Sequence, residues 1–358
     1  MRNLASIRQV AALSPIPGKD RIVLAQIDGW QVIVKKDEFQ VGDLCVYSEI
    51  DSVLPERPEF EFLRDKKFRI KTLRLGGVLS QGICFPMSIL PPGDYALGQD
   101  VTDVLGVRQY VPTMDIDQPA QEPKKVYHYP DFLMRWKWFR RLVLPKKQDM
   151  SWPPQISKTD EVRIQNIPAI LNDREKSWVC TEKVDGSSGS FLLVRRKRRF
   201  PFLKDKFDYI VCSRNLRRPQ QDGSCYWAVS NLYDIPGVLK KMIGDADWVA
   251  LQGEIIGPKI QGNKYGYGTY DLFIFNVLYP DGRLPSTLAQ QRCCEHHLRF
   301  VPILGIMTLP PTVDEVLKIA HGESKLAPVP REGLVFRSLD GRDSFKAVDP
   351  LFLLKYDE

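Results

Sequence analysis

The stretch C-T-E-K-V-D-G-S-S-G-S-F, from Cys180 to Phe191, places one lysine between an acidic residue and an Asp-Gly pair. It predicts a strand that delivers Lys183 and a turn at Asp185-Gly186 that fixes the chain just past it. Lys183 is then either a surface lysine before a β-turn, which the hexamer T-E-K-V-D-G alone favours, or a nucleophile held in a pocket. Because a protonated lysine is a poor nucleophile, the second interpretation requires neighbours that lower its pKa or take its proton.

Charged residues inside apolar segments favour the interpretation of Lys183 as a nucleophile over that of a surface lysine. Arg214 ends the strand-like segment V-C-S-R-N, Glu254 lies within L-Q-G-E-I-I-G-P, and Glu332 lies within R-E-G-L-V-F-R. Lys346 and Lys355 lie among hydrophobic residues in S-F-K-A-V-D-P-L-F-L-L-K-Y. A buried carboxylate costs several kcal/mol unless it is paired or bound to a metal. Each residue alone fits an ordinary ion pair, but together they are better explained by an anion site with a divalent metal ion.

Length and composition indicate a two-domain protein of a reduced compartment. The 358 residues are 43% hydrophobic and 27% charged, enough for two domains that each have a core. No apolar run predicts a membrane span, and the N-terminal residues lack the apolar core of a secretory signal. Seven scattered cysteines, an odd number, favour reduced thiols and an intracellular location, with cytoplasm and nucleus both open. The sequence indicates no obligatory protein partner.

The net charge of +7 is mild, but its distribution suggests a nucleic-acid partner. R-R-K-R-R (Arg195–Arg199) and R-W-K-W-F-R-R (Arg135–Arg141) concentrate basic residues, and the second interleaves them with Trp136 and Trp138. Phosphate pairing combined with base stacking is how single-stranded or gapped nucleic acid is held. The alternatives are a solvated hairpin tip or a nuclear address for the first segment, and packing of the rings between domains for the second.

Residues 1–105 predict an all-β module. The segment Ile22–Lys35 contains two β-rich runs joined by Asp28-Gly29, a strong hairpin signal. Val41–Tyr47 and Gly82–Pro86 predict further strands. About five short strands in about 100 residues fit a small closed barrel.

Within this module, K-K-F-R-I-K-T-L-R-L-G-G (Lys66–Gly77) alternates basic and apolar residues. A strand with this pattern would present Lys67, Arg69 and Lys71 on one face. We expect these residues, together with Arg74, to contact nucleic acid, and a merely solvated strand face is the alternative.

Residues 106–154 are rich in proline and polar residues, as linkers are, which places a connecting segment there and a second domain at residues 155–358. The second domain mixes helical and strand patterns, which predicts an α+β fold. Its predicted elements are a helix with a proline break at Cys225–Gly244, buried strands at Trp248–Pro258 and Tyr270–Tyr279, and a helix leading into a strand at Leu288–Leu304.

The five charged segments, taken in chain order, resemble the nucleotidyltransferase motifs shared by ATP-dependent ligases and RNA capping enzymes. The chain is most similar to the nick-sealing RNA ligases of bacterial type that carry an N-terminal OB-fold module, including N-terminal segments such as P-I-P-G-K-D-R-I and F-Q-V-G-D. The resemblance covers nearly the whole chain. It implies an OB-like barrel over residues 1–105, then an α+β adenylyltransferase (ATP-grasp-like ligase) domain with antiparallel sheets. Deleting residues 1–105 is then expected to weaken sealing and to leave adduct formation largely intact, as for a module that clamps the substrate.

The resemblance assigns adenylyl transfer to lysine residues. Lys183 would attack the α-phosphate of ATP and form lysyl-AMP, while Lys346 would hold the AMP phosphate. A second lysine follows two residues later in some relatives, but that position is Val348 here, so Lys355 is the alternative partner. The segment Asp349–Leu351 also departs from the polar pair expected there.

The resemblance further implies a nucleotide pocket and a divalent cation. Glu332 would bind Mg²⁺ or Mn²⁺, and Glu254 the ribose hydroxyls or a metal-bound water, because hard cations prefer carboxylate oxygens. The other implied nucleotide contacts are Thr181 and Glu182 beside the adenine, Asp185 and Gly186 in the turn, Arg214 on the ribose or phosphate, and Phe275 on the purine face with Phe273 as the less favoured choice.

The implied function is an ATP-dependent RNA ligase that seals 3′-OH/5′-phosphate breaks, in particular nicks with RNA on the 3′-OH side. The reaction would pass through lysyl-AMP and an adenylylated 5′ end, with ATP and Mg²⁺ or Mn²⁺ as cofactors and nicked RNA or an RNA-containing duplex as partner. A capping-type guanylyltransferase or a DNA ligase is the alternative within the superfamily. A non-catalytic RNA-binding protein with a degenerate transferase domain is the alternative of another class, against which the intact Lys183, Glu254 and Glu332 argue.

Two further segments carry weaker signals. In C-C-E-H-H only Cys293 and His297 share a helix face, so helix packing is favoured over a zinc site. G-N-K-Y-G-Y-G (Gly262–Gly268) is similar to a phosphate-binding loop, but its spacing fits none of the usual patterns, and a mobile surface loop is favoured.

Overall fold

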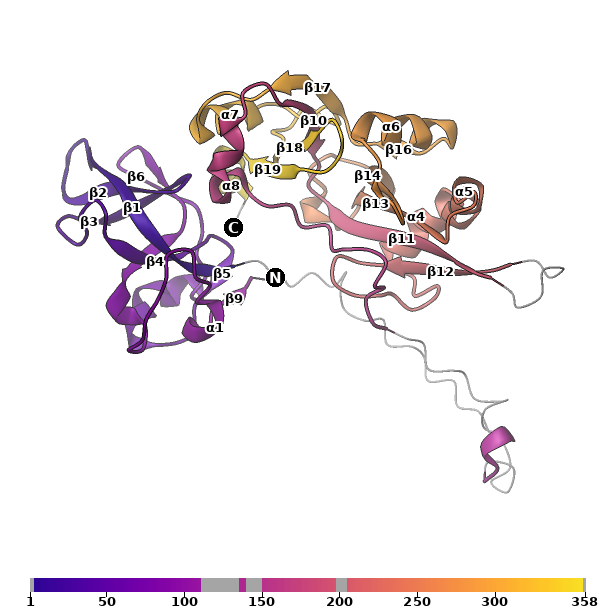
Figure 1. The fold of residues 1–358 in the computed structure, drawn as a ribbon, viewed down its shortest axis with the longest axis horizontal. Coiled ribbons are helices and arrows are strands. Elements are labelled where there is room, and N and C mark those ends of the chain that lie inside the picture. The colour runs from indigo at the N-terminus through magenta and orange to yellow at the C-terminus, as the bar shows by residue number, and fades with distance from the viewer. Residues whose placement is uncertain (1–2, 111–134, 140–149, 198–204, 357–358) are drawn as a thin grey trace. The chain divides into compact units, whose positions relative to one another are not determined.

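The computed structural model describes residues 3–110, 135–139, 150–197 and 205–356. The chain forms two compact units, and antiparallel strand pairing dominates the sheets of each (Figure 1). The chain crosses from the first unit to the second between Val184 and Asp185, inside the K-V-D-G segment. The first unit contains Met1–Thr113, Glu161–Val184 and Pro302–Glu358, and the second contains Met114–Asp160 and Asp185–Val301.

The domain boundaries predicted near residues 105 and 154 stay predictions, because a division into compact units does not show which segments fold alone. The proline-rich segment Asp115–Lys125 of the predicted linker lies outside the described residues. Among the residues that the structure describes, no helix combines the length and apolar character needed to cross a bilayer.

The N-terminal part of the first unit is an antiparallel sheet of five strands in the order β3-β2-β1-β4-β8. Asp28-Gly29 joins β2 to β3, which confirms the predicted hairpin. The long strand β1 pairs with β4 through its first half and with β2 through its second half. Near the two outer strands, the Gln81 amide donates to the Gln31 carbonyl at 2.8 Å. The elements of this all-β module are β1 (Ala5–Ile16), β2 (Lys19–Ile27), β3 (Trp30–Lys35), β4 (Leu44–Ser48), β5 (Ser52–Val53), η1 (Pro58–Lys66), β6 (Leu73–Leu75), β7 (Val78–Ser80), β8 (Ile83–Pro86), η2 (Met87–Ile89), α1 (Thr102–Leu105) and β9 (Arg108–Gln109).

The segment Lys66–Gly77 forms a strand only at Leu73–Leu75 (β6), and not over Lys67–Lys71 where the alternation predicted one. The 3₁₀ helix η1 ends at Lys66, its C-cap residue Lys67 has a left-handed φ of 52°, and Phe68 follows with a φ of 58°. Phe68 and Ile70 are then buried in the core of the module. Burial of these side chains, and not the basic-apolar alternation, sets the path of the chain here.

The three basic residues predicted to share a face, Lys67, Arg69 and Lys71, therefore do not do so. Arg69 is buried, pairs with Asp51 at 3.3 Å and lies 3.6 Å from the centre of the Tyr110 ring. Lys71 is half-buried, whereas Lys67 and Arg74 are exposed. The predicted common face is wrong, and nucleic-acid contact by the exposed residues stays a prediction.

The C-terminal part of the first unit is a four-stranded antiparallel sheet in the order β17-β10-β18-β19. One face packs against α7 around three fully buried rings. Phe345 stacks on Phe336 at 5.0 Å between centroids and meets Trp178 edge-on at 5.1 Å. The elements are η4 (Ile164–Asn166), η5 (Pro168–Asn172), β10 (Ser177–Lys183), β17 (Ile303–Thr308), α7 (Val313–Ala320), β18 (Gly333–Ser338), β19 (Ser344–Val348) and α8 (Pro350–Tyr356).

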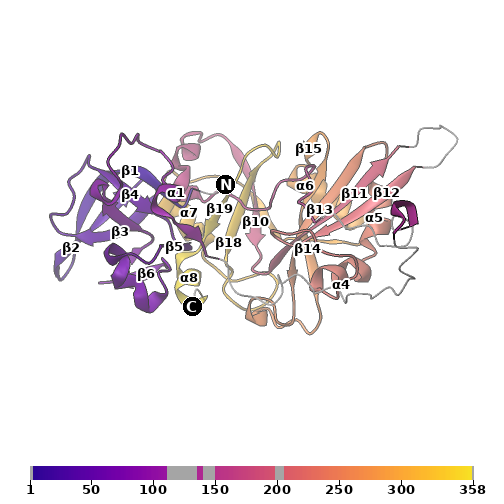
Figure 2. The ribbon, with the colours of Figure 1, turned by 90° about the horizontal axis from the view of Figure 1, so that it is seen from below.

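The second unit is built on a sheet in the order β12-β11-β13-β14-β15, with β16 paired in parallel to β14 (Figure 2). Apolar residues of α4, α5 and α6 pack on one face of this sheet. Pro236 at the start of α5 separates it from α4, which confirms the predicted proline break. Cys293 is buried in the same core, as helix packing predicts. The elements are β11 (Ser187–Arg196), β12 (Lys206–Cys212), α4 (Cys225–Leu232), α5 (Ile235–Met242), β13 (Trp248–Ile256), η6 (Gln261–Asn263), β14 (Asp271–Tyr279), β15 (Gly282–Arg283), α6 (Ser286–Glu295) and β16 (Arg299–Phe300).

The N-terminal module packs against η4 within the first unit. At the β2–β3 turn, the Gly29 amide donates to the Gln165 carbonyl at 3.1 Å. A Cβ on Gly29 would lie 2.6 Å from the Gln165 Cα, so only glycine permits this approach. The Trp30 indole donates to Asn166 Oδ1 at 2.7 Å.

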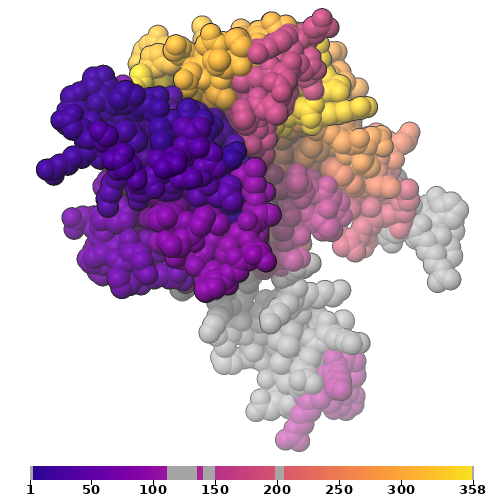
Figure 3. Space-filling view, turned by 60° about the vertical axis from the view of Figure 1, so that its left-hand side comes forward, coloured from indigo at the N-terminus to yellow at the C-terminus, as the bar shows by residue number. Residues whose placement is uncertain are grey.

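Buried polar groups and one apolar contact extend this interface. Arg163 pairs with Asp51 at 3.2 Å, and the Asn166 amide donates to Glu49 at 2.7 Å. Leu353 of α8 packs against the core of the module. In the space-filling view, the indigo module lies directly beside yellow residues of the C-terminal segment (Figure 3). The module is therefore docked on the rest of its unit through buried contacts.

We expect Phe345→Ala to lower the free energy of unfolding by about 3–5 kcal/mol, because it removes a fully buried ring and leaves a cavity between two others. Urea denaturation measures the change. Leu339→Ala, in the exposed turn after β18, is the control and should change stability by less than about 0.5 kcal/mol. Equal losses for both variants would contradict the packing described here.

Candidate active site

Strand β10 carries core residues on one face and Lys183 on the other. Side chains alternate along a strand, so Thr181 and Lys183 share a face. Thr181 lies opposite Val335 of β18, which lies opposite Lys346 of β19. Lys183 and Lys346 therefore lie on one face of this sheet, and α7 packs on the opposite face.

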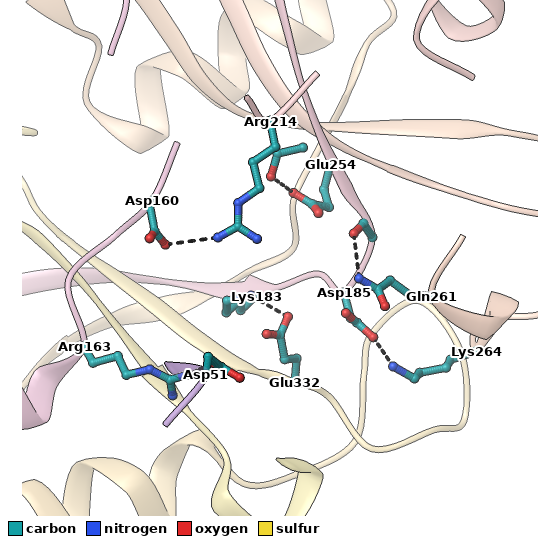
Figure 4. A network of polar contacts seen from close by, with 12 residues as sticks. Asp51, Asp160, Arg163, Lys183, Asp185, Arg214, Glu254, Gln261, Lys264 and Glu332 are labelled. Carbon is teal, nitrogen blue, oxygen red and sulfur yellow. Dashed lines mark hydrogen bonds and ion pairs between the residues drawn. The ribbon is translucent and has the colours of Figure 1, made fainter. Parts of the chain in front are cut away.

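Lys183 and Glu332 form an ion pair at the ends of neighbouring strands. The Lys183 Nζ lies 2.5 Å from Glu332 Oε2, and the two side chains are 24% and 15% exposed (Figure 4). Gly333, which follows Glu332, lies opposite Lys183 with a φ of 156°. A Cβ there would lie 2.2 Å from the Ala347 carbonyl oxygen. Glycine thus lets β19 approach β18 beside the ion pair.

Lys346 is buried, and Lys355 is not. Lys346 is 8% exposed on β19, and its amide donates to the Val162 carbonyl at 2.8 Å. Lys355 lies on α8, where it is exposed and its Nζ is 4.9 Å from the centre of the Tyr356 ring. Val348, at the position of the absent second lysine, is buried opposite Gly333. The hydrophobic residues around Lys355 in the sequence therefore do not bury it in the structure.

Glu182 is buried on the face opposite Lys183. Its carboxylate accepts hydrogen bonds from the Ser324 hydroxyl and from the Lys325 amide, the latter at 2.8 Å. Cys180 lies on the same face, where burial raises the pKa of its thiol to about 12. The sequence predicted Glu182 but gave no signal for its partners, because a serine and a backbone amide form no recognisable pattern. Thr181 donates to the Val335 carbonyl at 3.2 Å.

The second unit begins with the Asp185-Gly186 turn, which is held by the loop after β13. Lys264 forms an ion pair with the Asp185 carboxylate, and the Asp185 amide donates to the Tyr265 hydroxyl at 2.9 Å (Figure 4). A Cβ on Gly186 would lie 2.3 Å from the Ile255 carbonyl oxygen, so the turn requires glycine. Lys264 and Tyr265 were not predicted as site residues, because the glycine spacing of their loop matches no known pattern.

Glu254 lies on the face of the second sheet that faces away from α4, α5 and α6. Its carboxylate accepts a hydrogen bond from the Ser188 hydroxyl at 2.9 Å. Phe273 lies directly opposite Glu254 on β14 and is buried. A β-bulge near Gly253 separates that pair from Phe275, which is half-buried. Both rings are thus on the strand beside Glu254, and Phe273 is the one in register with it.

Arg214 follows β12 in the same unit. Its guanidinium lies 3.6 Å from the Asp160 carboxylate, and the two side chains are 47% and 33% exposed (Figure 4). An ion pair this open to water is weak, so Arg214 remains available to an anionic ligand.

The candidate ligands for a divalent cation are single carboxylates. Within the described residues, no group of three or more His, Cys, Asp or Glu side chains is arranged to hold a metal. Mg²⁺ is commonly held by one or two carboxylates, with water and substrate phosphate oxygens completing its shell. Glu332 in the first unit and Glu254 in the second fit that kind of binding.

The basic segments singled out in the sequence are only partly described. Arg195, Arg196 and Lys197 each pair with a carboxylate, namely that of Asp205, Asp208 and Asp247. Pairing of this kind favours the solvated hairpin over a phosphate clamp. Trp136 and Trp138 are each 58% exposed, and their contact with nucleic acid stays a prediction. Arg198, Arg199, Arg140 and Arg141 lie outside the described residues.

Comparisons with known proteins agree with this geometry. A family model described as RNA ligase matches residues 176–356, and a model described as an OB-fold domain matches residues 4–87. The comparison with curated proteins gave no match.

Solved structures of a Naegleria gruberi RNA ligase are similar over the full chain. The structure with PPi is 31% identical with a TM-score of 0.82, and the match covers 100% of this chain and 99% of that one. A lysine-to-methionine variant with AMP and Mn is 30% identical, with a TM-score of 0.82 and 99% of each chain covered. A lysine-to-alanine variant with ATP and Mn is 29% identical, with a TM-score of 0.81 and 99% of each chain covered.

The family match covers half of the chain, and the N-terminal match confirms the predicted OB-fold module. The chain belongs to the RNA ligase family, with an OB-fold domain ahead of the ligase domain.

Proposed function

We propose that this RNA ligase uses ATP to seal 3′-OH/5′-phosphate nicks with RNA on the 3′-OH side, through a lysyl-AMP intermediate at Lys183. The observation that carries the proposal is the position of Lys183 at the end of β10, half-buried and 2.5 Å from Glu332. Lys346 supplies a second positive charge on the same face of the sheet.

Adenylyl transfer begins when Lys183 attacks the α-phosphorus of ATP. The Nζ–P bond forms, the bond from that phosphorus to the bridging oxygen breaks, and pyrophosphate leaves. The ion pair with Glu332 stabilises the ammonium form, so the amine must lose a proton before it can attack. The Glu332 carboxylate lies within reach to receive that proton.

The remaining site residues bind the nucleotide and neutralise the negative charge of its phosphates. Lys346 and Arg214 offset the charge that gathers on the transferred phosphate. A ring on β14 stacks on the purine: Phe275 is the predicted one, and Phe273 is now favoured by its register with Glu254. Mg²⁺ or Mn²⁺ held at Glu332, or at Glu254, would add positive charge at the phosphates. Thr181 and Glu182 in the first unit, and Asp185 and Gly186 in the second, complete the proposed set.

Lys183 then passes AMP to the 5′-phosphate at the nick, which frees the amine. The RNA 3′-hydroxyl attacks the activated phosphorus, forms the phosphodiester and displaces AMP. Lys67 and Arg74, exposed on the OB-fold module, are the residues proposed there to contact the nucleic-acid backbone.

The relatives support these assignments. The Naegleria structures carry ATP with Mn, AMP with Mn, or PPi, which are the nucleotide, product and leaving group of this scheme. Their variants replace a lysine and an aspartate two positions apart, and a glutamate and a lysine fourteen positions apart. Lys183 and Asp185, and Glu332 and Lys346, have the same separations in this chain.

We expect Lys183→Met to abolish covalent labelling by ATP that carries a labelled α-phosphate, because no other amine occupies the end of β10. Lys176→Met, just before the same strand, is the control and should label like the unchanged protein. Gel electrophoresis after denaturation measures the adduct, and mass spectrometry locates it. Full labelling of the Lys183 variant would place the nucleophile elsewhere.

Sealing assays on nicked duplexes test the substrate. We expect sealing when the 3′-OH strand ends in RNA and little sealing when it ends in DNA, with ATP preferred over GTP for labelling. Equal sealing of DNA ends would favour the DNA ligase alternative. Labelling by GTP would favour a capping-type guanylyltransferase, and absence of any adduct would favour a binding protein.

Deletion of residues 1–105 should lower both adduct formation and sealing. The deletion would uncover Arg163, Asn166 and Leu353, and Arg163 forms a parallel bridge with the strand of Lys346. This replaces the expectation from sequence that only sealing would suffer. Labelling and sealing rates of the truncated and full chains are compared at equal concentration, and unchanged labelling would mean that the module acts on the nucleic acid alone.

A further inference from the structure

The loop between β13 and β14 reaches back to the turn after the nucleophile. Lys264 pairs with the Asp185 carboxylate, and these side chains are only 18% and 12% exposed. Tyr265, 9% exposed, accepts a hydrogen bond from the Asp185 amide at 2.9 Å. The Gln261 amide also points to the Gly186 carbonyl, at 3.4 Å (Figure 4). Three side chains of one loop thus contact two consecutive residues of the turn.

The loop is itself fixed in an unusual conformation. Lys259, Gln261 and Asn263 have φ values of 64°, 45° and 49°, which non-glycine residues rarely adopt. The Asn263 side chain donates to the Tyr267 carbonyl at 3.0 Å and accepts from the Tyr267 amide at 3.1 Å. Ile260 anchors the loop in the core under the sheet. Such strained backbone persists only where the surrounding structure holds it, so these contacts fix the conformation of the loop. They do not support the prediction of a mobile surface loop.

The backbone of Asp185 lies close to that of the nucleophile by chain connection alone. Two peptide units separate it from Lys183, so their Cα atoms lie within about 7 Å. A turn free to rotate would move Lys183 relative to the residues beside it. A misplacement of about 1 Å at a reacting group can cost about a hundredfold in rate.

We propose that Lys264 and Tyr265 are positioning residues for adenylyl transfer, which act by holding the Asp185-Gly186 turn and, through it, the nucleophile Lys183. They do not touch the reacting atoms in this scheme. The inference rests on the proposed function, because it assumes that Lys183 is the residue that attacks. It assigns a purpose to the glycine-rich loop that neither the RNA ligase assignment nor the sequence supplied.

The test measures adduct formation in single turnover at several ATP concentrations, on the full chain. Lys264→Met should lower the maximal rate by about tenfold to a hundredfold, with the ATP concentration for half-maximal rate changed less than about threefold. Lys264→Arg, which keeps the charge, should recover most of the rate. Lys259→Met, an exposed lysine of the same loop, should behave like the unchanged protein. A normal rate for Lys264→Met would overturn the proposal.

A double variant separates positioning from general destabilisation. If Lys264 acts through Asp185, then Lys264→Met with Asp185→Asn should be no slower than Asp185→Asn alone, whereas multiplied losses would overturn the proposal. Tyr265→Phe keeps the ring and removes the acceptor of the Asp185 amide, so it should lower the rate with little change in thermal stability. An unchanged rate for that variant would remove Tyr265 from the proposal.

The controls distinguish the failure of this inference from that of the proposed function. If the unchanged protein forms no adduct, or if Lys183→Met still forms it, the proposed function fails. If the unchanged protein is active and Lys264→Met matches it, only the positioning role fails.

Discussion

The ion pair between Lys183 and Glu332 joins the ends of two neighbouring strands, and the core behind those strands determines where it forms. Lys183 ends β10, and Glu332 directly precedes β18. The opposite face of the same strands carries Trp178 and Phe336, which are fully buried with Phe345. Side chains on both faces of a strand share one backbone. Close packing on one face therefore also restricts the position of the side chains on the open face. Apolar packing therefore fixes the strand that carries the reactive amine.

Two glycines permit the close approaches that this arrangement needs. Gly333 lies opposite Lys183, and Gly186 follows it in the chain; a Cβ on either would lie within 2.3 Å of a carbonyl oxygen. The D-G pair of the motif thus has a steric reason besides its turn preference. Gly186 also leaves room for Glu254, whose Cγ would lie 2.9 Å from a Cβ at that position.

The sequence singled out Lys183, Glu254 and Glu332 because they break the local pattern. Glu254 is a carboxylate within an apolar strand, Glu332 directly precedes one, and Lys183 ends a strand before a turn. The residues that escaped prediction break no pattern: Ser324, Lys325 and Tyr265 are ordinary residues that matter through what they contact.

Local sequence patterns led to wrong expectations at two places, and the physical reason is the same at both. Alternation at Lys66–Gly77 predicted a strand, but the burial of Phe68 and Ile70 in the module core decided the backbone there. Lys355 lies among hydrophobic residues in the sequence, yet α8 turns it outward while Phe352 is buried. In both, contacts between residues distant in sequence outweighed the local signal, which is why the hairpin at Asp28-Gly29, a purely local feature, was predicted correctly.

The chain passes from the first unit to the second inside the K-V-D-G motif, which carries the proposed nucleophile. This passage limits the positions that the Lys183 backbone can take. Lys183 belongs to a strand of the first unit, and Asp185 belongs to a turn of the second. Because only Val184 separates them, any contact that restrains Asp185 also limits where the Lys183 backbone can go. Asp185 is held by residues of the loop that follows the Glu254 strand, and Lys183 pairs with Glu332, which precedes β18. The peptide link at Val184 therefore connects residues that are held by side chains of different units.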